Sequence, residues 1–411
     1  MKKKSFLFIF GTLFFAICGT GLGQTPTTAI KAFCIDFNWG EGGPNAFPAP
    51  GLWADAAPKE HIEWYEALGC NVVQTFAVSC NGYAWYKGGV VPEQPGLKHD
   101  FLTEMVKLGH EKNMKVFGYF CVGANTKWGI DHPELSYGVP SDPHIPLTTA
   151  YLDYLCDSIK DALEKTDMDG FMVDWIWNPG ATMEPYPPLK WLACEREMFV
   201  ELMGRPFPGV EKITPELEKE FRRNAIARCW RRIHDTAKET NPDCQIWVTC
   251  CQVTSSDLEG SDMFKEADIF MNEDGDVGRV EGIRPLVGEH TRLLTCLASW
   301  NGMDPGVIIP QALKAGIGLY GFTKPQADSL LPPVAYYLSK PVDEFSGDNR
   351  SIAYFARIYN GLDIDYVKDM DVWTATSYEN IFRTAAKPAG GGFIRRLQAR
   401  PLVQCSLPTL K

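Results

Sequence analysis

The sequence contains none of the short motifs that identify common metal-dependent and nucleotide-binding enzymes. Neither His-x-His nor His-Glu-x-x-His occurs, which argues against a metal-dependent hydrolase. Gly-x-Ser-x-Gly and P-loop patterns are also absent, which removes the common serine hydrolases and the P-loop nucleotide-binding enzymes. We therefore predict that the protein uses no metal and no cofactor.

Positive charge is scarce. The chain has 40 Lys and Arg residues against 51 Asp and Glu residues, a formal net charge of −11. Without the three lysines at positions 2–4 the charge is −14 (−11 − 3). A chain this acidic is a poor candidate for nucleic-acid binding. After the first 23 residues no apolar run is long enough for a membrane helix, so we predict no membrane span.

Cysteine is plentiful, with thirteen residues, but no Cys-x-x-Cys pair occurs, which argues against a structural zinc site. Several cysteines, Cys34, Cys121 and Cys296 among them, fall inside predicted strands, where cysteine acts as a small buried hydrophobe. Export from the cytoplasm would permit disulfides, and one or two remain open without an assignment.

The N-terminus has the pattern typical of a secretory signal peptide. Lys2, Lys3 and Lys4 precede an apolar run over residues 6–17, and small residues follow at positions 21–23. We predict that residues 1–23 are removed, that the mature chain begins near Gln24, and that the protein is secreted or periplasmic.

Eight short apolar runs alternate with helical patterns along the rest of the chain. This alternation predicts an α/β fold of the (β/α)8 barrel type with loop insertions. We place the barrel at residues 24–345 and a C-terminal extension packed on it at residues 346–411. The predicted strands are 32–37, 71–78, 115–121, 169–174, 245–251, 268–272, 293–298 and 316–322. The main predicted helices are 58–68, 99–112, 148–165, 191–202, 215–239, 310–314 and 351–359.

Two blocks resemble the α-L-fucosidase family of retaining glycoside hydrolases. In the first, residues 58–119, Ser79-Cys80-Asn81-Gly82-Tyr83 stands where that family usually has His-His-Asp-Gly-Phe. The family's two sugar-contacting histidines are thus absent. The second block, residues 169–174, resembles the family's Asp-Gly-x-x-x-Asp strand, whose last Asp is the nucleophile. The resemblance covers about a quarter of the chain and implies that Asp174 is the nucleophile.

The position of Asp174 leads to the same residue independently. Catalytic residues of (β/α)8 enzymes lie at the carboxyl ends of strands, and Asp174 ends predicted strand four. Glycoside cleavage needs two carboxylates, and Glu273, just after strand six, is our acid/base candidate. Asp274, Asp276 and Glu184 are its competitors. The acidic run 273–276 also fits a solvated turn or a weak cation loop, and Asp174 also fits a helix cap.

Residues at other strand ends are candidates for sugar binding, because aromatic rings suit the apolar faces of sugars. They are Asp36, Asn81, Tyr83, Trp85, Asn125, Trp128, Trp175, Trp177, Trp300 and Lys324. Each tryptophan taken singly fits burial in the core as well. Asp36 also fits a hydrogen-bonding role within the barrel, and Lys324 fits a Schiff-base, an anion-binding or an ion-paired role.

These features together predict a secreted retaining glycoside hydrolase whose substrate is an oligo- or polysaccharide. The resemblance implies α-linked neutral or deoxy sugars, with fucose-containing glycans first. Two alternatives stay open. One is a barrel that binds carbohydrate without hydrolysing it, and the other is a lyase or aldolase that uses Lys324.

Overall fold

The computed structural model describes residues 29–43, 47–139, 142–176, 188–250, 253, 255–273, 275–297, 304–326 and 328–362. The predicted signal peptide lies outside these residues. All ten described cysteines are buried, and none of them forms a disulfide. Among the described helices, none combines the length and the apolar character needed to cross a membrane.

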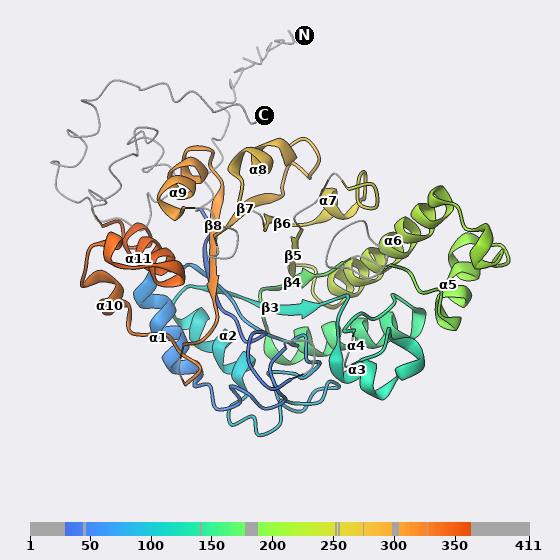
Figure 1. Ribbon diagram of the computed structural model, residues 1–411. Helices are drawn as coiled ribbons and strands as arrows, with labels where there is room; N and C mark the ends of the chain where they lie inside the picture. The colour runs from blue at the N-terminus through green and yellow to red at the C-terminus, as the bar shows by residue number, and fades with distance from the viewer. Residues whose placement is uncertain are drawn as a thin grey trace, which may run out of the picture.

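Eight parallel strands form a closed barrel in chain order, which confirms the predicted (β/α)8 fold (Figure 1). The ring closes where Lys31 of the first strand aligns with Leu319 of the last. The strands are β1 (Lys31–Ile35), β2 (Val72–Gln74), β3 (Lys115–Cys121), β4 (Gly170–Asp174), β5 (Gln245–Thr249), β6 (Ile269–Asn272), β7 (Arg292–Leu297) and β8 (Gly318–Thr323). Nearly all their residues are buried, as expected for parallel strands covered on the outside by helices.

Helices surround the barrel and fill its strand-end loops. They are α1 (Pro58–Leu68), α2 (Phe101–Glu111), α3 (Thr126–Asp131), α4 (Thr149–Thr166), α5 (Ala193–Met203), α6 (Pro215–Thr240), α7 (Met263–Glu266), α8 (Val277–Ile283), α9 (Pro305–Lys314), α10 (Val334–Leu338) and α11 (Gly347–Tyr359). The sequence pattern located α1 to the residue, because Pro58 begins it and Gly69, with a φ of +92°, ends it. The short helices α3, α7, α8 and α10 were not predicted.

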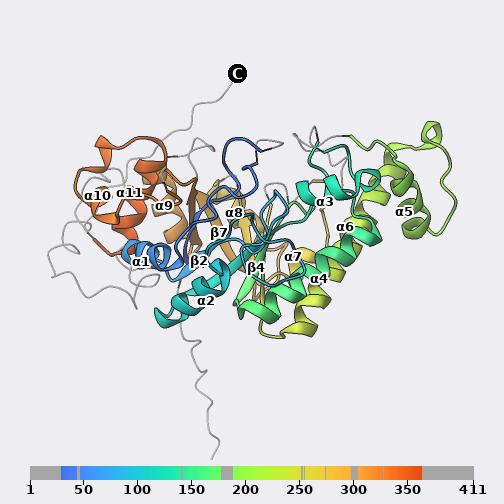
Figure 2. The same cartoon turned by 90° about the horizontal axis from the view of Figure 1, so that it is seen from below.

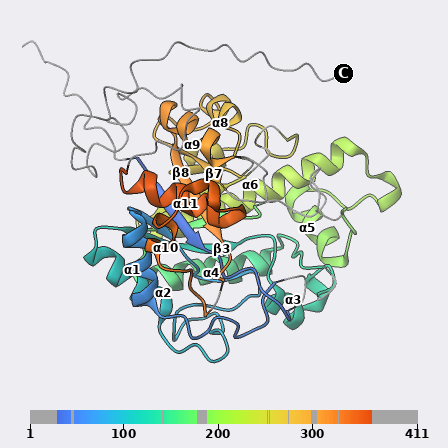
Figure 3. The same ribbon diagram turned by 60° about the vertical axis from the view of Figure 1, so that its left-hand side comes forward.

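Helix α11 belongs to the outer layer of the barrel. Figure 3 brings it to the front, beside α1 and α10, and it packs against β8. The Tyr359 hydroxyl donates hydrogen bonds to the carbonyl oxygens of Ala32 (2.9 Å) and Leu319 (3.2 Å), on the two strands that close the ring. Helix α11 is thereby attached to both strands at the point of closure.

Helix α5 and the first part of α6 extend away from the barrel on the side of α3, while the later part of α6 packs on the barrel (Figure 2). A second, smaller core holds them together. Trp191, Phe199 and Phe221 are its buried rings, with centroids of Trp191 and Phe221 5.1 Å apart. Because apolar burial is the main stabilising term in folding, this cluster supports the long excursion between β4 and β5.

The Asp-Gly pair that begins the Asp174 strand has a packing explanation. A methyl group on Gly170 would overlap the carbonyl oxygen of Gln245 on β5 and would lie 2.8 Å from the Phe117 ring on β3. We therefore expect Gly170→Ala to destabilise the protein by about 1–3 kcal/mol through overpacking, measured by denaturant unfolding.

Gly282→Ala is the matched control, because a methyl group there meets no atom within 4 Å. This residue lies inside α8, so we expect its replacement to change stability by no more than about 1 kcal/mol, in the stabilising direction. Equal effects of the two substitutions would contradict the close approach of β4 and β5 at Gly170.

Candidate active site

A cavity opens where the carboxyl ends of the barrel strands converge. Asp36 lies just after β1, Asp174 ends β4, and Glu273 follows β6, and all three line this cavity. The remaining lining residues are Asn38, Trp39, Phe47, Gln74, Cys80, Tyr119, Met172, Trp175, Met271, Cys296, Tyr320 and Phe322. The two residues that we predicted to be catalytic therefore share one cavity with a third carboxylate.

Asp174 is held in place by its neighbour on β3. The Tyr119 hydroxyl donates a hydrogen bond of 2.6 Å to Asp174 Oδ2, and it also lies 3.4 Å from the Cys80 sulfur. The other carboxylate oxygen, Oδ1, is shielded from solvent and has no hydrogen-bond partner among the residues that the structure describes. Since buried polar atoms are normally hydrogen-bonded, an orphan oxygen in a cavity wall marks a position where a ligand atom can bind.

Glu273 is oriented in a similar way from β5. The Thr249 hydroxyl donates a 2.5 Å hydrogen bond to Glu273 Oε1. Residues Asp174 and Glu273 come from strands that are separated only by β5, so their side chains approach the cavity from neighbouring directions. One tyrosine and one threonine hydroxyl thus fix one oxygen of each carboxylate.

The two carboxyl groups interact electrostatically. Burial raises the pKa of Asp174 well above its ordinary value, and the nearby charge of Glu273 raises it further, while the Tyr119 hydrogen bond opposes the shift. Burial also raises the pKa of Glu273, against the effect of the Thr249 hydrogen bond. Two carboxylates in one buried site resist simultaneous ionisation, so the pair favours a state in which only one of them is ionised.

Asp36 is the third carboxylate of the cavity. Its Oδ1 accepts a hydrogen bond from the backbone N–H of Asn38 (2.7 Å), and its Oδ2 accepts one from the indole Nε1 of Trp39 (3.1 Å). Burial raises the pKa of Asp36 to about 6, and the two hydrogen bonds limit that rise. Asp36 thereby fixes the Trp39 ring, which is 48% exposed, at the cavity.

Trp175 lines the cavity directly after Asp174. Its φ of +88° is a left-handed conformation that is unfavourable for a bulky side chain. Backbone strain of this kind costs on the order of 1–3 kcal/mol and persists only where the surroundings hold it. The surroundings here include His144, whose ring stacks on Trp175 with centroids 5.5 Å apart and an interplanar angle of 21°.

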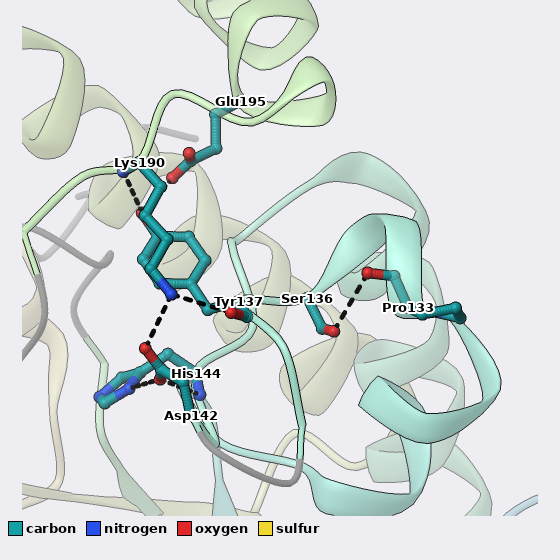
Figure 4. Close-up of polar contacts among 7 residues, drawn as sticks. All are labelled: Pro133, Ser136, Tyr137, Asp142, His144, Lys190 and Glu195. Atoms are coloured by element: carbon teal, nitrogen blue, oxygen red, sulfur yellow. Dashed lines mark hydrogen bonds and ion pairs between the residues drawn. The ribbon is translucent and has the colours of Figure 1, made fainter.

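His144 belongs to a polar network with Asp142, Lys190, Tyr137 and Glu195 (Figure 4). Asp142 Oδ1 lies 2.6 Å from His144 Nδ1, and Lys190 Nζ lies 3.2 Å from Asp142 Oδ2. Lys190 also donates to the Tyr137 carbonyl oxygen, and the Tyr137 hydroxyl donates a 2.5 Å hydrogen bond to Glu195. The network ties the loop after α3 to the start of α5, and so it braces the ring that packs on Trp175.

Four residues predicted to bind substrate make structural contacts and do not line the cavity. Asn81 accepts hydrogen bonds from Gln94 and the Tyr83 backbone, which shapes the loop after β2. Asn125 accepts a 2.9 Å hydrogen bond from the Trp128 N–H and so caps α3.

The rings of Trp85 and Trp128 are buried, and neither lines the cavity. Trp85 stacks on Phe37 with centroids 4.4 Å apart, and Trp128 stacks on His132 at 3.7 Å. The alternative of burial in the core, which we weighed for each tryptophan, therefore holds for these two.

The remaining predicted residues lie elsewhere or cannot be placed. Tyr83 and Lys324 are outside the cavity lining, and Lys324 is exposed. Asp276 accepts a hydrogen bond from the Arg279 N–H, caps α8 and does not line the cavity. The others, Trp177, Glu184, Asp274 and Trp300, lie outside the described residues.

Several cavity residues were not predicted from the sequence. Trp39 lies three positions after Asp36, just after the end of a predicted strand, so its position in the sequence could have marked it as a candidate for sugar binding. Tyr119, Gln74 and Tyr320 lie inside strands, where their apolar neighbours marked them only as core. The Tyr320 hydroxyl donates a 2.6 Å hydrogen bond to Gln74, a contact between β8 and β2 that no local pattern reveals.

The three carboxylates do not form a metal centre in the part of the chain that the structure describes. No group of three or more His, Cys, Asp or Glu side chains there has an arrangement that could hold an ion. The carboxylates are therefore set around the cavity rather than gathered on one point.

Residues 57–175 match a family model described as "Hypothetical glycosyl hydrolase 6". The matched segment contains the loop after β2 and ends one residue after Asp174, so it includes our nucleophile candidate but not Glu273. Among curated protein sequences, none matches the chain.

Solved structures of glycosidases share the fold. An α-L-fucosidase isoenzyme 2 from Paenibacillus thiaminolyticus superposes with a TM-score of 0.57 at 16% identity, over 80% of this chain and 50% of that one. A β-galactosidase from Marinomonas ef1 superposes with a TM-score of 0.54 at 12% identity, over 82% of this chain and 61% of that one. The PgaB (BpsB) glycoside hydrolase domain from Bordetella bronchiseptica superposes with a TM-score of 0.52 at 11% identity, over 74% of this chain and 97% of that one. The chain thus spans about half the length of the fucosidase chain.

Proposed function

We propose that the protein is a retaining glycoside hydrolase in which Asp174 is the nucleophile and Glu273 the acid/base. The observation that carries the proposal is the pair itself, two buried and electrostatically coupled carboxylates on strand ends β4 and β6 in one cavity. The fold, shared with solved glycosidases, and the family match over residues 57–175 support the same reaction class.

The reaction needs one ionised and one protonated carboxyl group in the pair. Glu273 holds the proton and donates it to the leaving glycosidic oxygen, while ionised Asp174 attacks the anomeric carbon. Glu273 then takes a proton from water, and that water releases the sugar from Asp174. Tyr119 stabilises the ionised form of Asp174 through its hydrogen bond, and Trp175 supplies an aromatic wall for the sugar ring.

The proposed substrate is an α-linked sugar in an oligo- or polysaccharide. Fucosyl glycans are the first to test, because residues 58–119 and 169–174 resemble α-L-fucosidases and a fucosidase structure shares the fold. We further propose that residues 1–23 direct the protein to the periplasm or outside the cell, where such polymers occur. The proposal involves neither nucleic acid nor a membrane span.

The lyase or aldolase alternative loses its support, since Lys324 is exposed and lies outside the cavity lining. The non-hydrolytic alternative rests on the histidines that are missing around Ser79 and Cys80, and it is separated from the enzyme by experiment.

The test is a screen of aryl glycosides and dye-labelled glycans, with the anomer of the first product read by NMR. We expect hydrolysis with retention of configuration. Inversion would contradict Asp174 as a nucleophile, and covalent labelling of Asp174 by a mechanism-based inhibitor would separate a slow enzyme from a binding protein.

A further inference from the structure

The cavity combines negative charge with aromatic surface and holds no basic residue among the described residues that line it. Asp36, Asp174 and Glu273 supply the carboxylates. Its aromatic lining residues are Trp39, Phe47, Tyr119, Trp175, Tyr320 and Phe322. Carboxylates next to aromatic rings are the surroundings that a cation prefers, because both attract positive charge.

Three lysines of the surrounding strand-end loops do not offset this charge. Lys127 pairs with Asp131, and Lys190 pairs with Asp142, so each of these lysines meets a carboxylate of its own. Lys324 is exposed and outside the lining.

The sequences that follow β4, β5 and β7 also lack basic residues. Residues 177–187, 251–254 and 298–303 contain no Lys, Arg or His, and the first of these segments contains Glu184. No basic side chain is therefore available from these three segments to balance the cavity carboxylates.

We propose that the sugar unit bound in this cavity carries a protonated amine, so that the substrate is an amino-sugar glycan with free amino groups. This inference rests on the proposed hydrolase function and narrows its substrate class from neutral to cationic sugars. An ammonium group donates three hydrogen bonds, has no acceptor, and matches the oxygens of a carboxylate such as Asp36.

Asp36 is the residue that would select for this amine. Asp174 and Glu273 are engaged in the proposed chemistry, whereas Asp36 is a carboxylate with no assigned step. Its two hydrogen bonds, from Asn38 and Trp39, fix its orientation and place it beside an exposed indole ring. Carboxyl and ring together can hold an ammonium group by charge and by cation–π attraction.

Burial of three carboxyl groups has a cost that a cation removes. Burial raises the pKa of each of them, to about 6 for Asp36. A positive charge within a few ångströms favours the ionised forms and lowers these pKa values again. A neutral sugar provides hydrogen-bond donors but no such charge.

The test is a calorimetric titration of the full chain with oligosaccharides of glucosamine and of galactosamine, each as the free amine and as the N-acetylated form. A fucosylated oligosaccharide is the neutral comparison, and product analysis runs in parallel. We expect a free-amine form to bind about tenfold tighter than its N-acetylated partner, with an advantage that shrinks as salt screens the charges.

Asp36→Asn should reduce this preference to about twofold or less, since it removes the charge and keeps the side-chain shape. Glu63→Gln is the matched control, because it also removes one negative charge but lies on α1 and outside the cavity. It should keep the full preference. Melting temperatures of both variants show whether they fold. If Asp36→Asn does not fold, the difference in wild-type affinity between free-amine and N-acetylated oligosaccharides decides whether the cavity prefers an amine.

The outcomes separate the two proposals. Equal or tighter binding of the N-acetylated or fucosylated oligosaccharides, or no binding of any free-amine form, overturns the amine inference. Hydrolysis of neutral glycans with that result leaves the hydrolase proposal intact. A free-amine preference without hydrolysis of any glycan supports the inference about the cavity and contradicts the proposed enzyme.

Discussion

Replacing Asp174 with Asn should lower kcat by a factor on the order of 10⁴ to 10⁶ while the fold is retained. The amide is nearly isosteric and can still accept the hydrogen bond from Tyr119, but it cannot form the glycosyl ester that a retaining mechanism requires. The measurement is steady-state kinetics on the best aryl glycoside from the substrate screen, with circular dichroism and thermal unfolding to confirm folding.

Asp169→Asn is the matched control on the same strand segment. Asp169 stands just before β4, at the opposite end of the strand, where it accepts a hydrogen bond from the Val116 N–H and pairs with His110 at 2.9 Å. Its replacement should cost stability, on the order of 1 kcal/mol, and leave kcat within about twofold of wild type. Wild-type activity in Asp174→Asn would exclude the nucleophile assignment.

The barrel could be predicted because its signals are local. Each strand is a short apolar run, and helices such as α1 begin at a proline and end at a glycine. The position of Asp174 at the cavity could be predicted for the same reason, since a carboxylate at the end of an apolar run is recognisable in the sequence. The end of each strand was less predictable: β2 stops at Gln74, although apolar residues continue to Val78.

The cavity wall could not be predicted in the same way, because a ring's exposure depends on partners far away in the chain. Trp85 and Trp39 both lie in loops that follow strand ends. Trp85 is buried against Phe37 from the preceding loop, whereas Trp39 is held at the cavity by Asp36. The contact between Trp85 and Phe37 could not be predicted from the sequence, because it joins segments almost fifty residues apart.

Charge was predictable only in sum. The net charge of −11 argued against nucleic-acid binding but did not show where the acidic residues gather. The barrel topology does so, since it brings Asp36, Asp174 and Glu273 from strands β1, β4 and β6 to one opening. A cavity with three carboxylates then constrains the substrate more narrowly than the resemblance to fucosidases does.

Replacing Glu273 with Gln should lower turnover by about 10²- to 10⁴-fold on glycosides with poor leaving groups, which is the usual contribution of a general acid. Glycosides with a good leaving group, such as dinitrophenol, need no proton. Asp174 should still attack them, and the glycosyl-enzyme should accumulate, because the introduced amide cannot activate water. Mass spectrometry would show one added sugar, placed on Asp174 by peptide mapping.

Azide distinguishes a lost acid/base from a damaged site, because it attacks the anomeric carbon without a general base. It should restore turnover of the dinitrophenyl glycoside by Glu273→Gln and yield a glycosyl azide of retained configuration. Asp276→Asn is the control in the same acidic run, since Asp276 caps α8 and lies outside the cavity lining. Its stability should change by no more than about 0.5 kcal/mol, because Asn caps a helix about as well as Asp, and its activity should be kept. If Asp276→Asn were inactive while Glu273→Gln kept full activity on poor leaving groups, the acid/base would not be Glu273, and the pairing of β4 with β6 would have to be abandoned as the source of the chemistry.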